Sequence, residues 1–302
     1  MLRWGVGMGT ALAILLTFRW FYVDFTPDPS LSPGVDSIPR VRENTVSFAI
    51  PPRPKGKTWI PATPVGTTQI APQKSPPSPT AVEFEVFEGY AIAYGDIILG
   101  QVGPDQKIQH GYYEPRPTQF WEKEIPYAIR ETLPHPERVE EAIQYFQKNT
   151  GLSFVPYQGQ SDAIIFEPGG PDCTSALGRI GGLQPIRLAD ECRPAQIIHE
   201  IMHALGFFHE QSRPDRDEYL TIHWENIEER YRLQFAVVPP SYLEVLGDSA
   251  FDFNSVMLYR SHDFALQNQL PTLSSKKSDP IEPVPYGLSN GDLKRLHRIY
   301  GN

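Results

Sequence analysis

The sequence predicts an α+β fold of one or two domains. Its 302 residues are 40% apolar, which is enough for a sizeable packed core. Segments rich in Val, Ile, Phe and Tyr, with turn residues between them, predict strands at 81–103, 125–129, 152–157 and 163–168. Apolar residues at helical spacing predict two helices, at 136–150 and 195–205. Strands and helices are therefore both expected to contribute to the core.

The charge balance argues against nucleic acid as a partner. The formal net charge is −9, and no stripe of clustered Lys and Arg occurs along the chain. Binding to a phosphate backbone requires such clusters. The glycine-rich motifs that bind nucleotide phosphates are also missing from the sequence. We therefore expect a partner other than nucleic acid.

The first 25 residues have the character of an export signal. An uncharged run from Trp4 to Phe18 follows Arg3, and Arg19 interrupts it before further apolar residues up to Phe25. The run to Phe18 suits the apolar part of a cleaved signal peptide. Read through to Phe25, the segment is long enough for an uncleaved membrane anchor. Both interpretations predict export, with the rest of the chain extracellular or anchored outside the cytoplasm.

Residues 26–80 are rich in proline, as in PDPSLSPG and APQKSPPSPT. This composition cannot bury enough apolar surface to offset the entropy of ordering, and proline favours an extended spacer. We expect a disordered linker here. After it, residues 81–103 alternate in polarity and contain glycine, which predicts one or two strands separated by turns.

The two predicted helices each have an apolar face. That of helix 136–150 consists of Val139, Ile143 and Phe146. That of helix 195–205 consists of Ile197, Ile198, Ile201 and Leu205. Residues 173–192, before the second helix, are rich in glycine and are expected to form a loop.

The stretch HEIMHALGFFHE, residues 199–210, has the spacing of a metal site. His199 and His203 are four positions apart, so a helix brings both imidazoles to one face, within reach of one ion. Glu200 lies beside that face and suits a general base acting on water. Gly206 can adopt a positive φ and end the helix, so that the chain returns and His209 approaches the same ion. Three neutral nitrogen ligands with an open position predict catalytic zinc rather than three core histidines.

Cys173 and Cys192 are the only cysteines in the sequence. In an exported protein, two cysteines at this separation favour one disulfide that closes a loop. Two free buried thiols are the alternative.

The extended zinc motif and several other segments resemble the astacin family of metzincin zinc endopeptidases. The similar segments are HEQSRPDRDEYLTIHWENI (209–227), SVMLY (255–259), CTSALGRIGGLQPIRL (173–188) and LSNGDLKRLHRIY (288–300). The resemblance covers about residues 118–302 and implies a zincin fold of the metzincin type. In that fold, an N-terminal lobe holds a twisted, mostly parallel sheet and two long helices. An irregular C-terminal lobe holds a Met-turn, and zinc lies in the cleft between the lobes.

The resemblance also implies roles for residues outside the zinc motif. Met257 would lie under the zinc as a hydrophobic floor. Tyr259 would be a switchable zinc ligand that leaves the metal to stabilise the oxyanion. Glu210 would pair with the buried N-terminus of the mature enzyme. Cys173 and Cys192 would form one of the two disulfides usual in the family, whereas the partners of the other are both missing here.

Members of the family are made as latent zymogens, in which an Asp of a pro-segment ligates the zinc. The common form places this Asp directly after Phe-x-Gly, whereas FEGY in this chain is not followed by Asp. Asp96, in YGDIIL, is therefore the candidate switch; Glu88 is the second candidate, and an Asp with only a turn role is the alternative. The expected division is a pro-segment at 81–115, a peptidase domain at 116–302 and activation cleavage between about Val102 and Trp121.

Together these inferences predict a zinc-dependent endopeptidase with one zinc per chain. Glu200 would take a proton from the attacking water and pass it to the leaving amine, while Tyr259 and zinc stabilise the oxyanion. Expected partners are protein or peptide substrates and an activating protease, with a membrane tether if the N-terminal segment stays uncleaved. A related zincin with a downstream glutamate as third ligand would leave Gly206 and His209 without a role. A non-catalytic zinc-dependent binding protein on the same scaffold is the remaining alternative.

Overall fold

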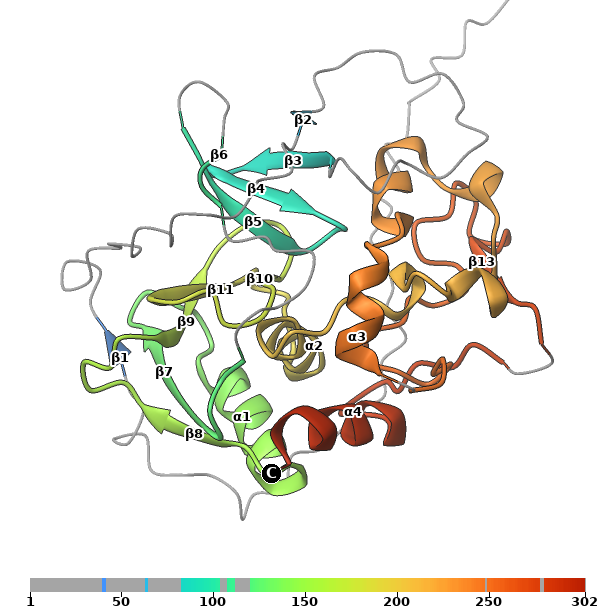
Figure 1. Ribbon diagram of the computed structural model, residues 1–302. Coiled ribbons are helices and arrows are strands. Elements are labelled where there is room, and N and C mark those ends of the chain that lie inside the picture. Colours follow the sequence, from blue (N-terminus) through green and yellow to red (C-terminus); the bar gives the residue numbers. More distant parts are fainter. Residues whose placement is uncertain are drawn as a thin grey trace, which may run out of the picture. The chain divides into compact units, whose positions relative to one another are not determined.

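The described part of the chain consists of a mixed β-sheet with helices packed beside it, followed after α2 (Pro194–Ala204) by a largely irregular segment that contains a separate two-stranded sheet of β12 (Leu220–Ile222) and β13 (Leu273–Ser275) (Figure 1). The computed structural model describes residues 40–41, 63–64, 83–103, 108–111, 120–247, 249–277 and 280–301. The predicted export segment at 1–25 and nearly all of the predicted linker at 26–80 lie outside these residues. Among the described residues, no helix combines the length and the apolar character needed to cross a membrane.

The strands and helices follow one another along the chain with these bounds. The first part contains β1 (Arg40–Val41), β2 (Thr63–Pro64), β3 (Glu83–Phe87), β4 (Tyr90–Ala93), β5 (Ile97–Val102) and β6 (Ile108–Gly111). The middle part contains β7 (Glu124–Arg130), α1 (Glu137–Asn149), β8 (Ser153–Pro156), β9 (Ala163–Pro168), β10 (Thr174–Ala176), β11 (Leu183–Leu188) and α2 (Pro194–Ala204). The last part contains β12 (Leu220–Ile222), α3 (Leu243–Leu246), β13 (Leu273–Ser275) and α4 (Asn290–Tyr300), with short 3-10 turns between them.

The main sheet combines parallel and antiparallel pairing. Its order is β1-β7-β9-β11-β10-β5-β4-β3-β2, with β8 paired to β7 and β6 paired to β5. β8, β9 and β11 run parallel to β7 or to one another, as expected for a mostly parallel sheet. β10 is antiparallel to β11 and parallel to β5, and β3, β4 and β5 form an antiparallel meander. The sheet as a whole is therefore mixed, because β10 is antiparallel to β11 and the antiparallel meander of residues 83–102 extends the sheet beyond β10.

Two sequence expectations about strands were wrong. Residues 81–103 contain three strands rather than one or two, since both glycine-containing turns reverse the chain within the same meander. Residues 173–192, expected to be a loop, contain β10 and β11. Gly181 and Gly182 adopt positive φ in the turn before β11, and Pro185 lies inside that strand, opposite Ile165. Because glycine and proline are signals for turns and not for buried strands, they concealed β11.

The helices α1 and α2 pack against each other and the sheet, and both have the apolar faces that their spacing predicts. The cluster they share contains Val139, Ile143 and Phe146 of α1, Ile197, Ile198 and Ile201 of α2, and Ile125, Ile164 and Phe166 of the sheet. All nine side chains are buried. Since a fully buried side chain of this size contributes about 1.5–3 kcal/mol, this cluster fixes α2 firmly against the sheet.

The disulfide between Cys173 and Cys192 is confirmed. Cys173 lies directly before β10, and Cys192 lies two residues before Pro194, the first residue of α2. The bond therefore ties the start of β10 to the start of the helix that carries the zinc motif.

The meander of residues 83–102 packs on the rest of the chain through an apolar face. The residues in this second cluster are Phe84, Ala91, Ala93, Tyr94, Ile97 and Leu99 of the meander, with Leu177, Phe208, Val238, Tyr242, Val245 and Leu246. Strand β5 adds hydrogen bonds by pairing with β10. The turn between β4 and β5, which carries Asp96, is thus held from both sides.

Candidate metal centre

Helix α2 brings His199 and His203 together, as their spacing of four predicts. Their ring centroids are 4.7 Å apart. The helix ends in a Schellman motif, in which Gly206, at φ 103°, donates its N–H to the carbonyl of His203 and Phe207 donates to that of Met202. Only a residue that tolerates positive φ fits this position, and Gly206 does so without strain.

The reversal at Gly206 returns the chain so that His209 faces the other two histidines. Its ring centroid lies 4.8 Å from that of His203 and 5.1 Å from that of His199. The Nε2 atoms of His199 and His209 are 3.1 Å apart. The carboxylate of Asp96 lies against all three Nε2 atoms, at 3.1 Å from His209, 3.2 Å from His203 and 3.4 Å from His199. All four donor atoms lie within 4.8 Å of one another, a group that could hold one metal ion.

Backbone carbonyls orient two of the imidazoles. Nδ1 of His199 lies 2.9 Å from the carbonyl oxygen of Val256, and Nδ1 of His203 lies 2.6 Å from that of Phe207. Because a carbonyl only accepts, both Nδ1 atoms carry the proton and both Nε2 atoms offer a lone pair. Sequence motifs do not mark such carbonyls, and neither Val256 nor Phe207 was identified from the sequence.

The polar atoms at the centre of the histidine cluster are arranged as ligands for a metal ion rather than as hydrogen-bond partners of one another. His203 Nε2 and Asp96 Oδ1 are both buried and 3.2 Å apart, yet neither has a hydrogen-bond partner within the described residues. Buried polar atoms are normally satisfied, so this arrangement needs a further group. Burial lowers the pKa of His203 to about 4, against the opposing effect of Asp96, so the ring is neutral near pH 7. Neutral imidazoles with a carboxylate match the ligands that zinc takes in proteins.

Glu200 is a buried carboxyl beside this cluster. Only 2% of its surface is exposed, and its Oε2 has no hydrogen-bond partner within the described residues. Burial raises the pKa of Glu200 well above its usual range, and the negative charges of Asp96 and Asp172 raise it further. The direction of this shift makes the Glu200 carboxylate a stronger base.

Tyr259 also lies next to the histidines. Its ring centroid is 4.8 Å from that of His209, and its hydroxyl donates to the carbonyl oxygen of Tyr94 at 3.3 Å. A Cβ on Gly95 would approach that hydroxyl to 2.8 Å, so the turn before Asp96 needs glycine to accommodate Tyr259. Burial, and then the negative charge of Asp96, raise the pKa of Tyr259 well above its usual range. The phenol therefore stays protonated and able to donate a hydrogen bond.

The two candidate switch residues occupy different places. Asp96 follows Gly95, at φ 100°, in the turn between β4 and β5, and its carboxylate meets the histidines. Glu88 lies in the turn before β4, is half exposed and forms an ion pair with Arg187. Of the two, the structure brings only Asp96 to the histidine cluster.

Glu210 and Met257 are both buried beside the histidine cluster. The N–H of Glu210 donates to the carbonyl of Met257 at 2.8 Å. The Glu210 side chain accepts from Arg295 at 2.7 and 2.8 Å and from Arg213 at 3.0 Å. The expected pairing of Glu210 with a new N-terminus stays a prediction, because residues 112–119 of the cleavage region lie outside the described part.

Comparisons with known proteins identify the family of this chain. The family model described as Astacin, a family of peptidases, matches residues 113–301. Zinc metalloproteinase nas-13 of Caenorhabditis elegans is 38% identical over 185 residues, which cover 60% of this chain and 40% of that protein. Meprin A subunit alpha of Rattus norvegicus is 34% identical over 189 residues, which cover 61% of this chain and 25% of that protein. The chain thus spans less than half the length of these two relatives.

A solved structure supports the same assignment. High choriolytic enzyme 1, a hatching enzyme zinc-protease from Oryzias latipes, matches with a TM-score of 0.54 and 30% sequence identity. The match covers 60% of this chain and 94% of that structure. Since the family match covers more than half of the chain and includes every histidine of the cluster, the chain belongs to the astacin family of zinc metalloproteinases.

Proposed function

We propose that this chain is a zinc endopeptidase made as a latent zymogen, with His199, His203 and His209 holding one zinc ion. The observation that carries the proposal is the convergence of three imidazole Nε2 atoms beside the buried carboxyl of Glu200. Membership of a zinc metalloproteinase family supports a zinc endopeptidase in general terms. A purely structural zinc site would not require a buried carboxyl with an unsatisfied oxygen next to it.

The roles of the side chains follow from their chemistry. Zinc held by the histidines would supply Lewis-acid chemistry, polarising the scissile carbonyl and making water more acidic. Glu200 takes the proton of the attacking water and passes it to the leaving amine, for which a raised pKa is suited. Tyr259, kept protonated by burial, donates a hydrogen bond to the oxyanion once its hydroxyl leaves the Tyr94 carbonyl. Met257 forms the apolar floor of the site in this proposal.

Latency in this proposal comes from Asp96. Its carboxylate fills the position that the attacking water needs, and the surrounding meander covers the adjoining apolar surface. Glu88, paired with Arg187, serves at most to dock the pro-segment. An activating protease would cut between about Val102 and Trp121, after which the meander and Asp96 leave the site.

The compartment and substrates in this proposal follow from the chemistry of the chain. A disulfide such as Cys173–Cys192 persists in an oxidising compartment, which supports export by the N-terminal segment. Proteins or peptides outside the cytoplasm are then the substrates. Sequencing the N-terminus of the protein recovered from culture medium and from membranes would test this. Recovery of the full-length protein only from the cytoplasm would contradict it.

The test of the activity uses the full chain and its Glu200→Ala variant. Both are treated briefly with trypsin, and casein cleavage is measured with and without a zinc chelator, together with zinc per chain. We expect wild type to gain chelator-sensitive activity on trimming. The variant should keep its zinc but lose at least about 100-fold in rate, because a positioned acid–base group contributes about that much or more.

Three other results of this test would contradict the proposal, each at a different point. If wild type binds one zinc but cleaves nothing after the pro-segment has been shown by mass spectrometry to be removed, the site serves binding and not catalysis. If wild type binds no zinc at all, the metal-site assignment itself is wrong. If Glu200→Ala cleaves as fast as wild type, another group acts as the base.

A further inference from the structure

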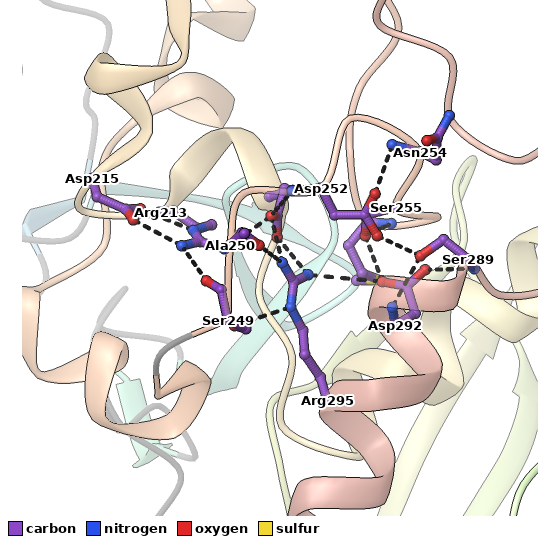
Figure 2. Close-up of polar contacts among 12 residues, drawn as sticks. Arg213, Asp215, Ser249, Ala250, Asp252, Asn254, Ser255, Ser289, Asp292 and Arg295 are labelled. Atoms are coloured by element: carbon purple, nitrogen blue, oxygen red, sulfur yellow. Dashed lines mark hydrogen bonds and ion pairs between the residues drawn. The ribbon is translucent and has the colours of Figure 1, made fainter. Parts of the chain in front are cut away.

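The start of helix α4 holds the turn that precedes Met257. Asp292 is completely buried, and its Oδ1 accepts from the hydroxyl of Ser255 at 2.6 Å. Its Oδ2 accepts from the backbone N–H of Val256 at 2.9 Å and from that of Ser289 at 3.1 Å. Figure 2 shows Asp292 at the first turn of α4, with dashed contacts to Ser255 and Ser289. One carboxylate thus links the helix to the turn through two donors, the Ser255 hydroxyl and the Val256 N–H, and also accepts from Ser289 at the helix cap.

This turn carries the carbonyl that orients a histidine of the metal centre. Val256 accepts from Nδ1–H of His199 at 2.9 Å. The same peptide unit contains the N–H of Met257, which donates to the hydroxyl oxygen of Ser255 at 3.1 Å. Because the peptide unit is planar, holding the Met257 N–H also fixes the direction of the Val256 carbonyl. The hydroxyl of Ser255 in turn donates to Asp292.

We propose that Asp292 is a positioning residue for the metal site. It fixes the peptide unit between Val256 and Met257, and that peptide unit sets the ring orientation and the tautomer of His199. The proposal rests on the proposed zinc function of His199. A carboxylate suits the position because every group that faces its oxygens at hydrogen-bond distance is a donor, and an ionised carboxylate only accepts. Partners of metal-bound histidines commonly change metal affinity by 10- to 100-fold when they are removed.

Asp292 also caps helix α4, and the experiment must distinguish this capping role from the proposed positioning of the metal site. Its backbone N–H donates to the Ser289 hydroxyl at 2.9 Å, and its carboxylate accepts from the Ser289 N–H, which together cap α4. A residue that only caps a helix would change stability and leave the metal site as it is. Ser289→Ala is the matched control, since it removes the cap acceptor, together with the hydrogen bond of the Ser289 hydroxyl to Asp252, while leaving the contacts of Asp292 with Ser255 and Val256 intact.

The experiment compares the full chain with its Asp292→Ala, Asp292→Asn and Ser289→Ala variants. The measurements are zinc affinity by competition with a chromophoric chelator, the visible spectrum of the cobalt-loaded protein, and the melting temperature of the metal-free protein. We expect Asp292→Ala to bind zinc about tenfold more weakly and to change the cobalt spectrum. Asp292→Asn should recover part of the affinity, because its amide oxygen still accepts from Val256. Ser289→Ala should melt earlier but keep wild-type affinity and spectrum.

The proposal is overturned if Asp292→Ala only melts earlier and keeps the zinc affinity and cobalt spectrum of wild type. If Asp292→Ala does not fold, Ser255→Ala decides, since it removes only the hydroxyl between Asp292 and the Met257 N–H. Weaker zinc binding by Ser255→Ala supports the proposal, and unchanged binding overturns it. If wild type itself binds no zinc, the proposed function fails and this inference with it, which is a distinguishable result.

Discussion

Replacing Arg295 by methionine should leave the buried carboxylate of Glu210 with one guanidinium instead of two. Arg295 donates from both terminal nitrogens to the two carboxylate oxygens of Glu210, at 2.7 and 2.8 Å. The exposed fractions of the two side chains are 4% and 2%. Figure 2 shows Arg295 reaching from α4 toward Ala250 and Ser249 as well. The pair therefore has little solvent to replace a lost partner.

The size of the effect follows from what remains around Glu210. Removing one partner of a buried ion pair costs about 3–5 kcal/mol, because an uncompensated charge is left behind. Glu210 would still accept from Arg213 at 3.0 Å and from the N–H of Asp252 at 2.8 Å. We therefore expect the lower end, about 3 kcal/mol. For a domain of this size that corresponds to a fall in melting temperature of about 6–12 °C.

The assay is thermal unfolding of the zinc-loaded full chain, followed by circular dichroism at a fixed scan rate. The matched control is Arg230→Met, because Arg230 is 67% exposed and pairs with Glu228 at 3.0 Å. An exposed pair of this kind contributes about 0–1 kcal/mol, so the control should melt within about 4 °C of wild type. If the melting temperature of Arg295→Met falls no further than that of this control, the stability of the protein does not depend on the Glu210–Arg295 pair and the reasoning fails.

Further predictions concern latency and the disulfide. Asp96→Ala should cleave casein without trypsin trimming, because the carboxylate that meets the histidines is gone. If this variant stays latent, the covering meander alone is enough to block the site. Glu88→Gln should stay latent in the same assay, since Glu88 contacts Arg187 and not the histidines, and premature activity would make Glu88 part of the switch. Cys173→Ser together with Cys192→Ser should lower stability by about 3 kcal/mol, the value for a loop of this length. Wild type treated with a reductant should melt at the same lowered temperature, and an unchanged melting temperature in either sample would refute the estimate.

The parts of the site that depend on local geometry could be predicted from the sequence. The helix at 195–205, its end at Gly206 and the return of His209 all follow from local spacings, and the structure has them. The disulfide was also predicted, because the chain contains only two cysteines. In each case one or two local rules decide the outcome.

Contacts between residues far apart in the sequence could not be predicted from spacing, and Asp96 and Tyr259 were expected near the histidines only through the family resemblance. The carbonyl that orients His199 is 57 residues away in the sequence, and Arg295 is 85 residues from Glu210. Ser255 and Asp292 are 37 residues apart. No periodicity or motif specifies which buried acceptor meets which donor over such distances. Strand β11 was missed for a related reason, since its pairing with β9 outweighs the turn preference of Pro185.

The choice between Asp96 and Glu88 shows that strand pairing can determine which residue reaches a site when the sequence motif does not. Glu88 lies in the turn before β4 and Asp96 in the turn after it, so the two residues are at opposite ends of this strand, whose four residues span about 13 Å at about 3.3 Å per residue. Only one of them can therefore reach the histidines. The carbonyl of Asp96 accepts from the N–H of Ser175 at 3.0 Å, where β5 joins β10. Because β10 belongs to the sheet that also supports α2, this pairing sets Asp96 against His199, His203 and His209, although the preceding Tyr-Gly departs from the common Phe-x-Gly pattern.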